Sequence, residues 1–229
     1  MKLNNFKKHL VCWGAGDQSI VLNPIINSLG AKYDIFIDDT PGKISPLEGI
    51  ELLKGREEFE KWFSGRDSTQ YGFVVAIGNP YGFVRCKIHD YLVAKGLTAV
   101  NICDSSALLE KNITVEDGVQ IMKAVIVNSD TKIGKQCILN TRSTVEHHDH
   151  LGMGVEIGPA STLCGRVDVK DFSWIGAGST ILPRISIGKN SIVGGGALVR
   201  ENVKEGTIVA GVPAKFIKLN PYKESLQND

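Results

Sequence analysis

Residues 145–163 read VEHHDHLGMGVEIGPASTL, and an aliphatic residue stands at every sixth position of this stretch. The same spacing extends without interruption from Val115 to Val199, fifteen consecutive positions that we call the anchors. A period of six fits neither an α-helix nor a flat strand and is typical of the hexapeptide repeat of a parallel β-helix. Each anchor must point inward to fill the core, because a slip of one residue would expose the whole set. Three hexapeptides make one coil, so residues 18 positions apart are predicted to stack about 4.8 Å from one another.

The overall composition argues against several classes of protein. The 229 residues include 26 lysines and arginines and 25 aspartates and glutamates, so no charge excess suggests nucleic acid or a membrane surface as a partner. No segment approaches the length of a transmembrane helix, and the N-terminus leads into a predicted strand rather than an apolar signal core. The five cysteines are widely spaced and include no CxxC pair, which indicates buried thiols in a reducing compartment. We therefore expect a cytoplasmic protein.

Residues 1–107 lack the six-residue period and instead alternate apolar runs with helical stretches. We expect strands at residues 9–12, 33–39, 73–77 and 97–102, and helices at residues 18–29 and about 83–95. This alternation predicts a small, Rossmann-like parallel α/β sheet. The predicted organisation is thus a nucleotide-binding α/β domain at residues 1–107, followed by an all-β parallel β-helix domain at residues 108–229.

Glycines and polar residues gather where the predicted strands of the first domain end. These residues are Gly14, Gly16, Asp38, Asp39, Gly78 and Asn79. Because parallel sheets bind ligands at the carboxyl ends of their strands, we expect a nucleotide-type ligand there. Two structural alternatives remain: the Gly-x-Gly pair also fits a plain strand-to-helix turn, and the aspartates could cap the next segment. Arg85, on the second predicted helix, could contact a phosphate or face solvent.

Three of the five histidines fall within residues 147–150. His147 lies two residues after the anchor Val145, and Gly165 lies 18 residues later, one coil above it. An imidazole facing a bare backbone amide suits acyl transfer, since the ring can take a proton from an amine or hydroxyl and the N–H can stabilise an oxyanion. A zinc site in the His/Asp cluster is an alternative, disfavoured because neighbouring positions diverge around a corner of the β-helix. For His150 a structural or solvent-facing role is expected.

Motifs along nearly the whole chain resemble those of a known family. They are Gly14-Ala15-Gly16, Ile37-Asp38-Asp39, Ala76-Ile77-Gly78-Asn79, Leu139-Asn140-Thr141, Val145-Glu146-His147, Cys164-Gly165, Ile175-Gly176-Ala177-Gly178, Gly194-Gly195-Gly196 and Gly211-Val212-Pro213-Ala214-Lys215. With them the chain resembles the bacterial nucleotide-amino-sugar N-acetyltransferases of the left-handed β-helix superfamily, to which sialic acid O-acetyltransferases are related. The resemblance implies a left-handed β-helix, a homotrimer, and acetyl-CoA bound between subunits as co-substrate, without a metal.

The resemblance also implies roles for individual residues. His147 would be the catalytic base, with His148 and Asn140 near it. The nucleotide would be held by Gly14, Gly16, Asp38, Asp39, Gly78 and Asn79, and acetyl-CoA would contact Glu156, Gly165, Ala177, Gly178 and Gly195. His148 stands where family members usually carry a carboxylate beside the base, so Asp149 or Glu146 would have to supply one. Glu156 stands where a histidine is often found.

These observations predict an acetyl-CoA-dependent N-acetyltransferase that acts on a nucleotide-linked amino sugar for surface glycan or glycoprotein synthesis. The resemblance favours a UDP-linked 4-amino-4,6-dideoxy sugar. The alternative is O-acetylation of sialic acid or another sugar. Two further alternatives would have the same β-helix fold. One is a metal lyase similar to γ-carbonic anhydrase, which needs a bound metal, and the other is an inactive trimer that serves as a binding scaffold.

Overall fold

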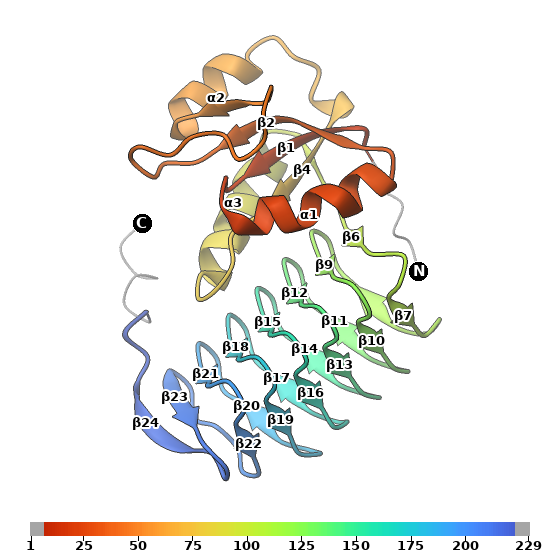
Figure 1. The fold of residues 1–229 in the computed structure, drawn as a ribbon, viewed down its shortest axis with the longest axis vertical. Helices are drawn as coiled ribbons and strands as arrows, with labels where there is room; N and C mark the ends of the chain where they lie inside the picture. Colours follow the sequence, from red (N-terminus) through yellow and green to blue (C-terminus); the bar gives the residue numbers. More distant parts are fainter. Residues whose placement is uncertain (1–6, 223–229) are drawn as a thin grey trace. The chain divides into compact units, whose positions relative to one another are not determined.

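The computed structural model describes residues 7–222, which divide into two compact units (Figure 1). The sheet unit comprises residues 7–78 and 87–102, and the prism unit comprises residues 79–86 and 103–222. No helix among the described residues is long and apolar enough to cross a membrane.

A five-stranded parallel sheet with the order β3-β2-β1-β4-β5 forms the sheet unit. The elements in chain order are β1 (His9–Trp13), α1 (Asp17–Ser28), β2 (Lys32–Ile37), β3 (Glu51–Leu53), α2 (Gly55–Phe63), the 3₁₀ helix η1 (Ser68–Gln70), β4 (Tyr71–Val75), α3 (Gly82–Ala94) and β5 (Thr98–Ala99). Residues 82–86 of α3 belong to the prism unit. The predicted small parallel α/β sheet is confirmed, whereas β3 and α2 were not anticipated.

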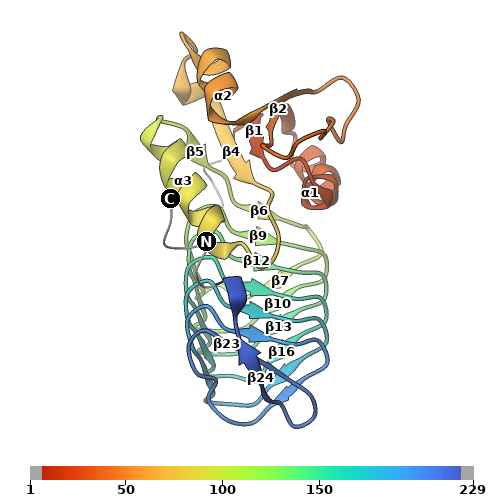
Figure 2. The ribbon, with the colours of Figure 1, turned by 90° about the vertical axis from the view of Figure 1, so that its left-hand side faces the viewer.

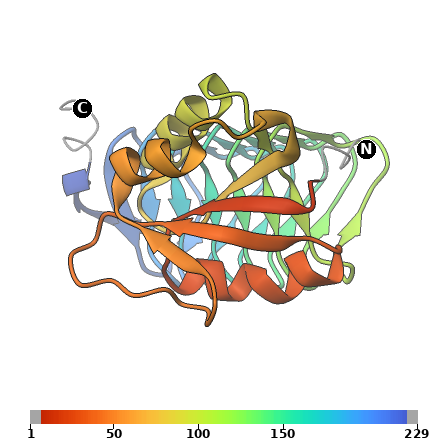
Figure 3. The same ribbon diagram turned by 90° about the horizontal axis from the view of Figure 1, so that it is seen from above.

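Helices cover both faces of this sheet (Figure 3). On one face, the Tyr33 hydroxyl of β2 donates to the Ser19 carbonyl of α1 at 3.1 Å. On the other, the Trp13 ring of β1 packs edge-on against Phe59 of α2 and Tyr91 of α3, with centroids 6.1 and 5.8 Å apart. Because side chains alternate along a strand and both faces are buried, the strands read as continuous apolar runs.

Three sheets of short strands build the prism unit, and the coils stack along its length (Figure 2). All their strand pairs are parallel except β23 and β24, which are antiparallel. The sheet orders are β22-β19-β16-β13-β10-β7, β20-β17-β14-β11-β8 and β24-β23-β21-β18-β15-β12-β9-β6. The strands are β6 (Ile102–Cys103), β7 (Leu108–Leu109), β8 (Thr114–Val115), β9 (Gln120–Ile121), β10 (Ile126–Val127), β11 (Lys132–Ile133), β12 (Ile138–Leu139), β13 (Thr144–Val145), β14 (His150–Leu151), β15 (Glu156–Ile157), β16 (Thr162–Leu163), β17 (Asp168–Val169), β18 (Trp174–Ile175), β19 (Thr180–Ile181), β20 (Ser186–Ile187), β21 (Ile192–Val193), β22 (Leu198–Val199), β23 (Thr207–Ala210) and β24 (Lys215–Leu219). This arrangement confirms the predicted left-handed β-helix.

The anchors form the core of the prism unit. Strands 18 residues apart pair in register, as Val145 of β13 does with Leu163 of β16. Every anchor from Ile121 to Val199 is at most 1% exposed, and only Val115, on the first complete coil, is half-buried. Each buried aliphatic side chain contributes about 1.5–3 kcal/mol by its removal from water. The burial of each anchor therefore independently favours the same pairing register between coils.

Replacement of a single anchor should be costly. Leu151→Ala removes a fully buried side chain and should lower the free energy of unfolding by about 2–5 kcal/mol, because the neighbouring coils cannot close the cavity. Denaturant titration at one protein concentration measures the change. Leu219→Ala, at a position 70% exposed on β24, is the control and should change stability by less than about 0.5 kcal/mol. Equal losses in the two variants would contradict this view of the core.

Candidate active site

His147 lies in the corner between β13 and β14 and faces Gly165 on the next coil. A Cβ atom built on Gly165 would lie 3.0 Å from Nε2 and 3.1 Å from Cε1 of the His147 ring. Gly165 has a φ of +98°, a conformation that side chains disfavour, so glycine is required both for its backbone and for the ring above it. The predicted stacking of these two residues is thus present, with Nε2 of the imidazole directed at the glycine.

A second ring and a carboxylate adjoin His147. The Nδ1 atoms of His147 and His148 lie 3.2 Å apart, so one ring donates a hydrogen bond to the other. Nε2 of His148 lies 3.6 Å from Oδ2 of Asp130, which is one coil below. Oδ1 of Asp130 in turn accepts a hydrogen bond from Nδ2 of Asn112 at 2.9 Å. The carboxylate that contacts the histidine pair therefore comes from Asp130, a residue that the sequence did not single out.

Asp149, expected as a possible partner of His147, is buried in the same corner. Its Oδ1 accepts a hydrogen bond from the Val167 N–H at 2.8 Å, and its Oδ2 has no hydrogen-bond partner among the described residues. Burial raises the pKa of Asp149 to about 7, and the charge of Glu146 adds to the rise. The backbone N–H groups of Val167, Glu146 and Gly165 oppose the rise because they stabilise the carboxylate. A carboxyl group that titrates near neutrality thus lies beneath the His147–Gly165 pair.

Three other residues singled out in the sequence, Asn79, Asn140 and Arg85, contact Glu156 of β15. Its Oε1 accepts hydrogen bonds from Nδ2 of Asn79 at 2.7 Å and from Nδ2 of Asn140 at 3.0 Å. Its Oε2 lies 3.5 Å from the guanidinium of Arg85, which is wholly buried and also donates to the carbonyl oxygens of Gly154 and Gln136. Burial lowers the pKa of Arg85 and raises that of Glu156, while their mutual attraction opposes both shifts. Arg85 is therefore not a solvated helix residue, because it binds segment 79–86 to the coils of the prism unit.

The Glu156 cluster and the His147 corner occupy different corners of the coil. Asn140 begins the corner between β12 and β13, whereas His147 lies in the next corner, between β13 and β14. Within one chain, the amide of Asn140 is engaged by Glu156. The roles expected for Asn140 beside the base and for Glu156 at acetyl-CoA stay predictions.

The carboxyl edge of the sheet unit gathers part of the predicted nucleotide site. Oδ2 of Asp38 accepts a hydrogen bond from the Ala15 N–H at 2.8 Å, and Oδ1 accepts one from the Thr40 N–H at 2.9 Å. Burial would raise the pKa of Asp38, but the hydrogen bonds from Thr40 and Ala15, with the nearby charge of Lys43, hold it below its usual range. Gly14 approaches β4 so closely that a Cβ would meet the Ala76 carbonyl at 2.5 Å. The first turn is therefore tied to both neighbouring strands.

The remaining predicted nucleotide residues are less tightly placed. Gly16 ends the turn before α1, and the amine of Lys43 lies 3.9 Å from where a Cβ of Gly16 would stand. Asp39 packs its carboxylate against Gly55 at the start of α2. Gly78 is the last residue of the first segment of the sheet unit, and Asn79 is the first of segment 79–86 in the prism unit. Lys43 is a basic group that sequence analysis missed, because only the folded loop brings it to Gly16 and Asp38.

The predicted acetyl-CoA residues Ala177, Gly178 and Gly195 lie on adjacent coils. A Cβ on Gly195 would lie 3.2 Å from the Ala177 carbonyl oxygen, and Gly178 turns its corner with a φ of +66°. These positions present backbone rather than side chains to a ligand, which suits a long, flexible cofactor chain. Their contact with acetyl-CoA stays a prediction.

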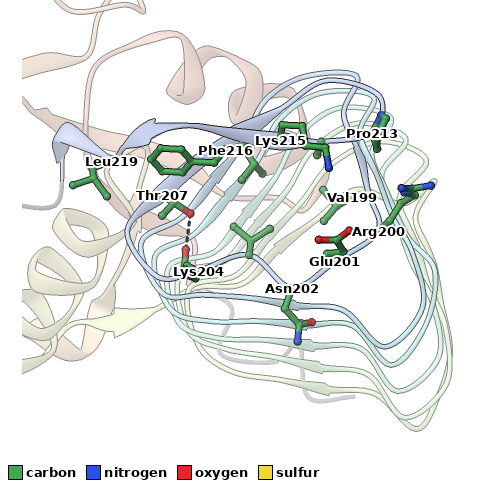
Figure 4. Close-up of a pocket in the computed structure, with 13 residues that line it drawn as sticks. Val199, Arg200, Glu201, Asn202, Lys204, Thr207, Pro213, Lys215, Phe216 and Leu219 are labelled. Carbon is green, nitrogen blue, oxygen red and sulfur yellow. Dashed lines mark hydrogen bonds between the residues drawn. The ribbon is translucent and has the colours of Figure 1, made fainter.

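A cavity of about 480 Å³ opens at the C-terminal end of the prism unit (Figure 4). Its walls combine apolar side chains such as Val209 and Phe216 with the basic residues Arg200, Lys204 and Lys215. It contains none of the residues predicted to be catalytic. Among residues 7–222, no group of three or more His, Cys, Asp and Glu side chains is arranged to hold a metal ion.

Known proteins match both the repeat and the whole chain. Residues 166–201 match the family model described as bacterial transferase hexapeptide (six repeats). A GDP-perosamine N-acetyltransferase of Escherichia coli O157:H7 is 27% identical over 173 residues, 72% of this chain and 74% of that protein. A solved variant of GDP-perosamine N-acetyltransferase from Caulobacter crescentus, in complex with CoA and GDP-perosamine, is 27% identical with a TM-score of 0.83, over 91% of this chain and 96% of that one. The acetyltransferase domain of PglB from Neisseria gonorrhoeae FA1090 shares the fold, with 24% identity and a TM-score of 0.81 over 93% and 100% of the two chains.

The fold and these matches define the chain as a hexapeptide-repeat acetyltransferase. Its structural neighbours include N-acetyltransferases named for nucleotide-linked amino sugars.

The ion pair of Arg85 and Glu156 should be essential for stability rather than merely favourable. Glu156→Gln leaves a buried guanidinium without its counter-charge and should lower the free energy of unfolding by about 3–5 kcal/mol. Glu60→Gln, which breaks the exposed ion pair with Lys95, is the matched control and should change stability little. Chemical denaturation measures the free energy of unfolding of both variants. A Glu156→Gln protein as stable as the control would show that the ion pair does not hold segment 79–86 against the coils.

Proposed function

We propose that this protein transfers the acetyl group of acetyl-CoA to the amine of a nucleotide-linked amino sugar. The observation that carries the proposal is the His147 imidazole, whose Nε2 is directed at a glycine that no other residue could replace without displacing the ring. The named relatives support the choice of acyl donor and acceptor class, since one solved neighbour holds both CoA and GDP-perosamine. O-acetylation of a free sugar is the competing reaction, and it requires no nucleotide.

In the proposed mechanism, the amine nitrogen attacks the carbonyl carbon of the thioester. Nε2 of His147 takes the proton from the attacking amine. The carbon–sulfur bond then breaks, and the proton passes from His147 to the departing thiolate. The backbone N–H of Gly165 is the donor that we assign to the oxyanion of the tetrahedral intermediate. The proposed steps require no metal, because an imidazole and an amide supply both the proton transfer and the charge stabilisation.

The neighbouring groups fit this direction of proton flow. If Nε2 of His147 is the base, its Nδ1 carries a proton and donates to Nδ1 of His148 over the 3.2 Å between them. His148 is then neutral, with its own proton on Nε2, facing the Asp130 carboxylate 3.6 Å away. In this arrangement His148 and Asp130 orient the base, a role that a carboxylate beside the base would otherwise fill.

The sheet unit is proposed to hold the nucleotide. The Gly14–Gly16 turn opens helix α1, whose first N–H groups are not capped by a side chain and favour an anion, and Lys43 adds a positive charge nearby. Asp38 and Asp39 lie at the strand ends where ribose or base donors are expected. A homotrimer with acetyl-CoA between neighbouring prisms completes the proposal, and sedimentation at the mass of three chains tests it.

His147 should be far more important for activity than His150, another accessible histidine of the run. His147→Ala should lower kcat by about 10²–10⁴-fold with little change in KM, the usual share of a general base. His150→Ala is the control, since His150 is exposed and its ring lies against Asp168, at 3.3 Å, rather than against Gly165. Steady-state kinetics with acetyl-CoA and an amino-sugar nucleotide compare the two; activity of His147→Ala within a few-fold of the parent would remove the assignment.

The nucleotide should be recognised independently of the acetyl donor. Thermal shift with UDP, GDP, dTDP and CMP should raise the Tm for one base and leave the others near the value without ligand, because only a ligand of the folded state stabilises it. UDP is the nucleotide that the family resemblance favours, and GDP is the nucleotide in the names of the relatives at 27% identity. Asp38→Ala should abolish the shift. No response to any nucleotide would favour O-acetylation of a free sugar.

A further inference from the structure

Four corner residues of the prism unit make a hydrogen bond that an ionised Asp149 cannot make. In these corners, the hydroxyl or thiol at the fourth position after an anchor donates to the carbonyl found 15 residues later on the next coil, whereas Ser179 and Ser191 donate to other carbonyls. The pairs are Thr131 to Glu146 at 2.9 Å, Cys137 to Gly152 at 3.0 Å, Ser161 to Gly176 at 2.7 Å and Ser173 to Gly188 at 2.7 Å. Asp149 occupies the same position after Val145, and the carbonyl 15 residues later is that of Cys164. An ionised carboxylate has no proton to donate and would repel that oxygen.

The backbone above Asp149 departs from the repeat accordingly. Elsewhere between residues 115 and 199, a positive φ occurs only at the third position after an anchor, as at His148 (+60°) and Arg166 (+53°). Gly165 has a φ of +98° at the second position, so the peptide that joins it to Cys164 is turned differently from its counterparts on the other coils. The N–H of Gly165 stabilises the Asp149 carboxylate, as the N–H of Val167 does. The amide assigned to the oxyanion therefore faces the buried carboxyl group.

We infer that Asp149 is a positioning residue that decides which way the Gly165 amide points. As a carboxylate, it holds the N–H inward. As a carboxylic acid, it donates its proton to the Cys164 carbonyl, as Thr131 one coil below donates to the Glu146 carbonyl, and the Gly165 N–H turns toward the side of His147, where the thioester oxygen would bind. This inference rests on the proposed acetyl transfer only for its effect on rate, since the orientation of the amide is a property of the protein alone.

The surroundings of Asp149 keep both forms accessible near neutral pH. Asp149 is only 1% exposed to solvent, and its pKa is raised to about 7. Both the carboxylate and the carboxylic acid are therefore populated near neutral pH. The titratable groups that face it are Glu146 in its own corner and Cys164 on the coil above, whose thiol pKa is raised by burial and by both carboxylates. The coil below contributes Thr131, which does not titrate. Activity through this group should fall as pH rises through its pKa, the opposite direction to the loss of a histidine base on acidification.

The test compares the parent protein with Asp149→Ser, which restores the hydroxyl used by other coils, and with the neutral isostere Asp149→Asn. The Gly165 amide signal, followed by ¹H–¹⁵N NMR from pH 5.5 to 9, should show a titration step near pH 7 in the parent that is missing from both variants, while any shift caused by the neighbouring His147 ring is common to all three proteins. The kcat/KM for acetyl-CoA should decline above pH 7 in the parent only, leaving the variants about tenfold faster at pH 8.5. Asp168→Ser, at a solvent-facing position, is the control and should keep the parent profile.

The two proposals fail in different ways. A Gly165 signal that titrates identically in the parent and in Asp149→Asn, with identical pH profiles, would overturn the role of Asp149. A signal that titrates only in the parent, together with no acetyl transfer to any amino-sugar nucleotide, would support the role of Asp149 and overturn the proposed function. Asp149→Asn keeps the shape of the side chain, so it provides the comparison if Asp149→Ser does not fold.

Discussion

The burial of one aliphatic side chain per hexapeptide is the constraint on which the rest of the structure depends. Because the anchors from Ile121 to Val199 are all buried, the pairing of coils 18 residues apart cannot slip without exposing the core. This register is what places Gly165 above His147, Asp130 beside His148, and Asp149 beneath Val167. The chemistry of the corner is therefore a consequence of the repeat: residues of three successive coils meet because their anchors are in register.

Buried polar groups define what the repeat alone leaves open. Arg85 and Glu156 cost several kcal/mol each to remove from water. Their mutual contact, the bonds that Glu156 accepts from Asn79 and Asn140, and the bonds that Arg85 donates to carbonyl oxygens recover this cost only where segment 79–86 lies against the coils. Asp149 has no cationic partner among residues 7–222, so its carboxyl is held by N–H groups and its pKa rises toward neutrality. The ion pair of Arg85 and Glu156 is a permanent structural contact. The Asp149 carboxyl titrates, and it lies directly beside the amide on which acetyl transfer is proposed to depend.

Most of the fold, and the position of His147 opposite Gly165, could be predicted from the sequence. The stacking of His147 and Gly165 needed only the 18-residue spacing, and the parallel sheet followed from alternating strands and helices. Contacts that depend on how loops and helices fold were not predictable: Lys43 reaches Gly16 through a loop, and Arg85 is buried although its composition and spacing suit a solvated helix. The contact of Asp130 with His148 follows from the same 18-residue spacing, although the two residues are far apart in sequence.

The central claim is that acetyl transfer takes place at the corner where His147 faces Gly165. A crystal structure with bound acetyl-CoA tests it most directly, because the thioester has one carbonyl oxygen that can be located. The account predicts this oxygen within hydrogen-bond distance of the Gly165 N–H, with Nε2 of His147 beside the carbonyl carbon on the face open to an amine. An acetyl group bound at another corner of the coil, or in the cavity lined by Lys215 and Phe216, would contradict it.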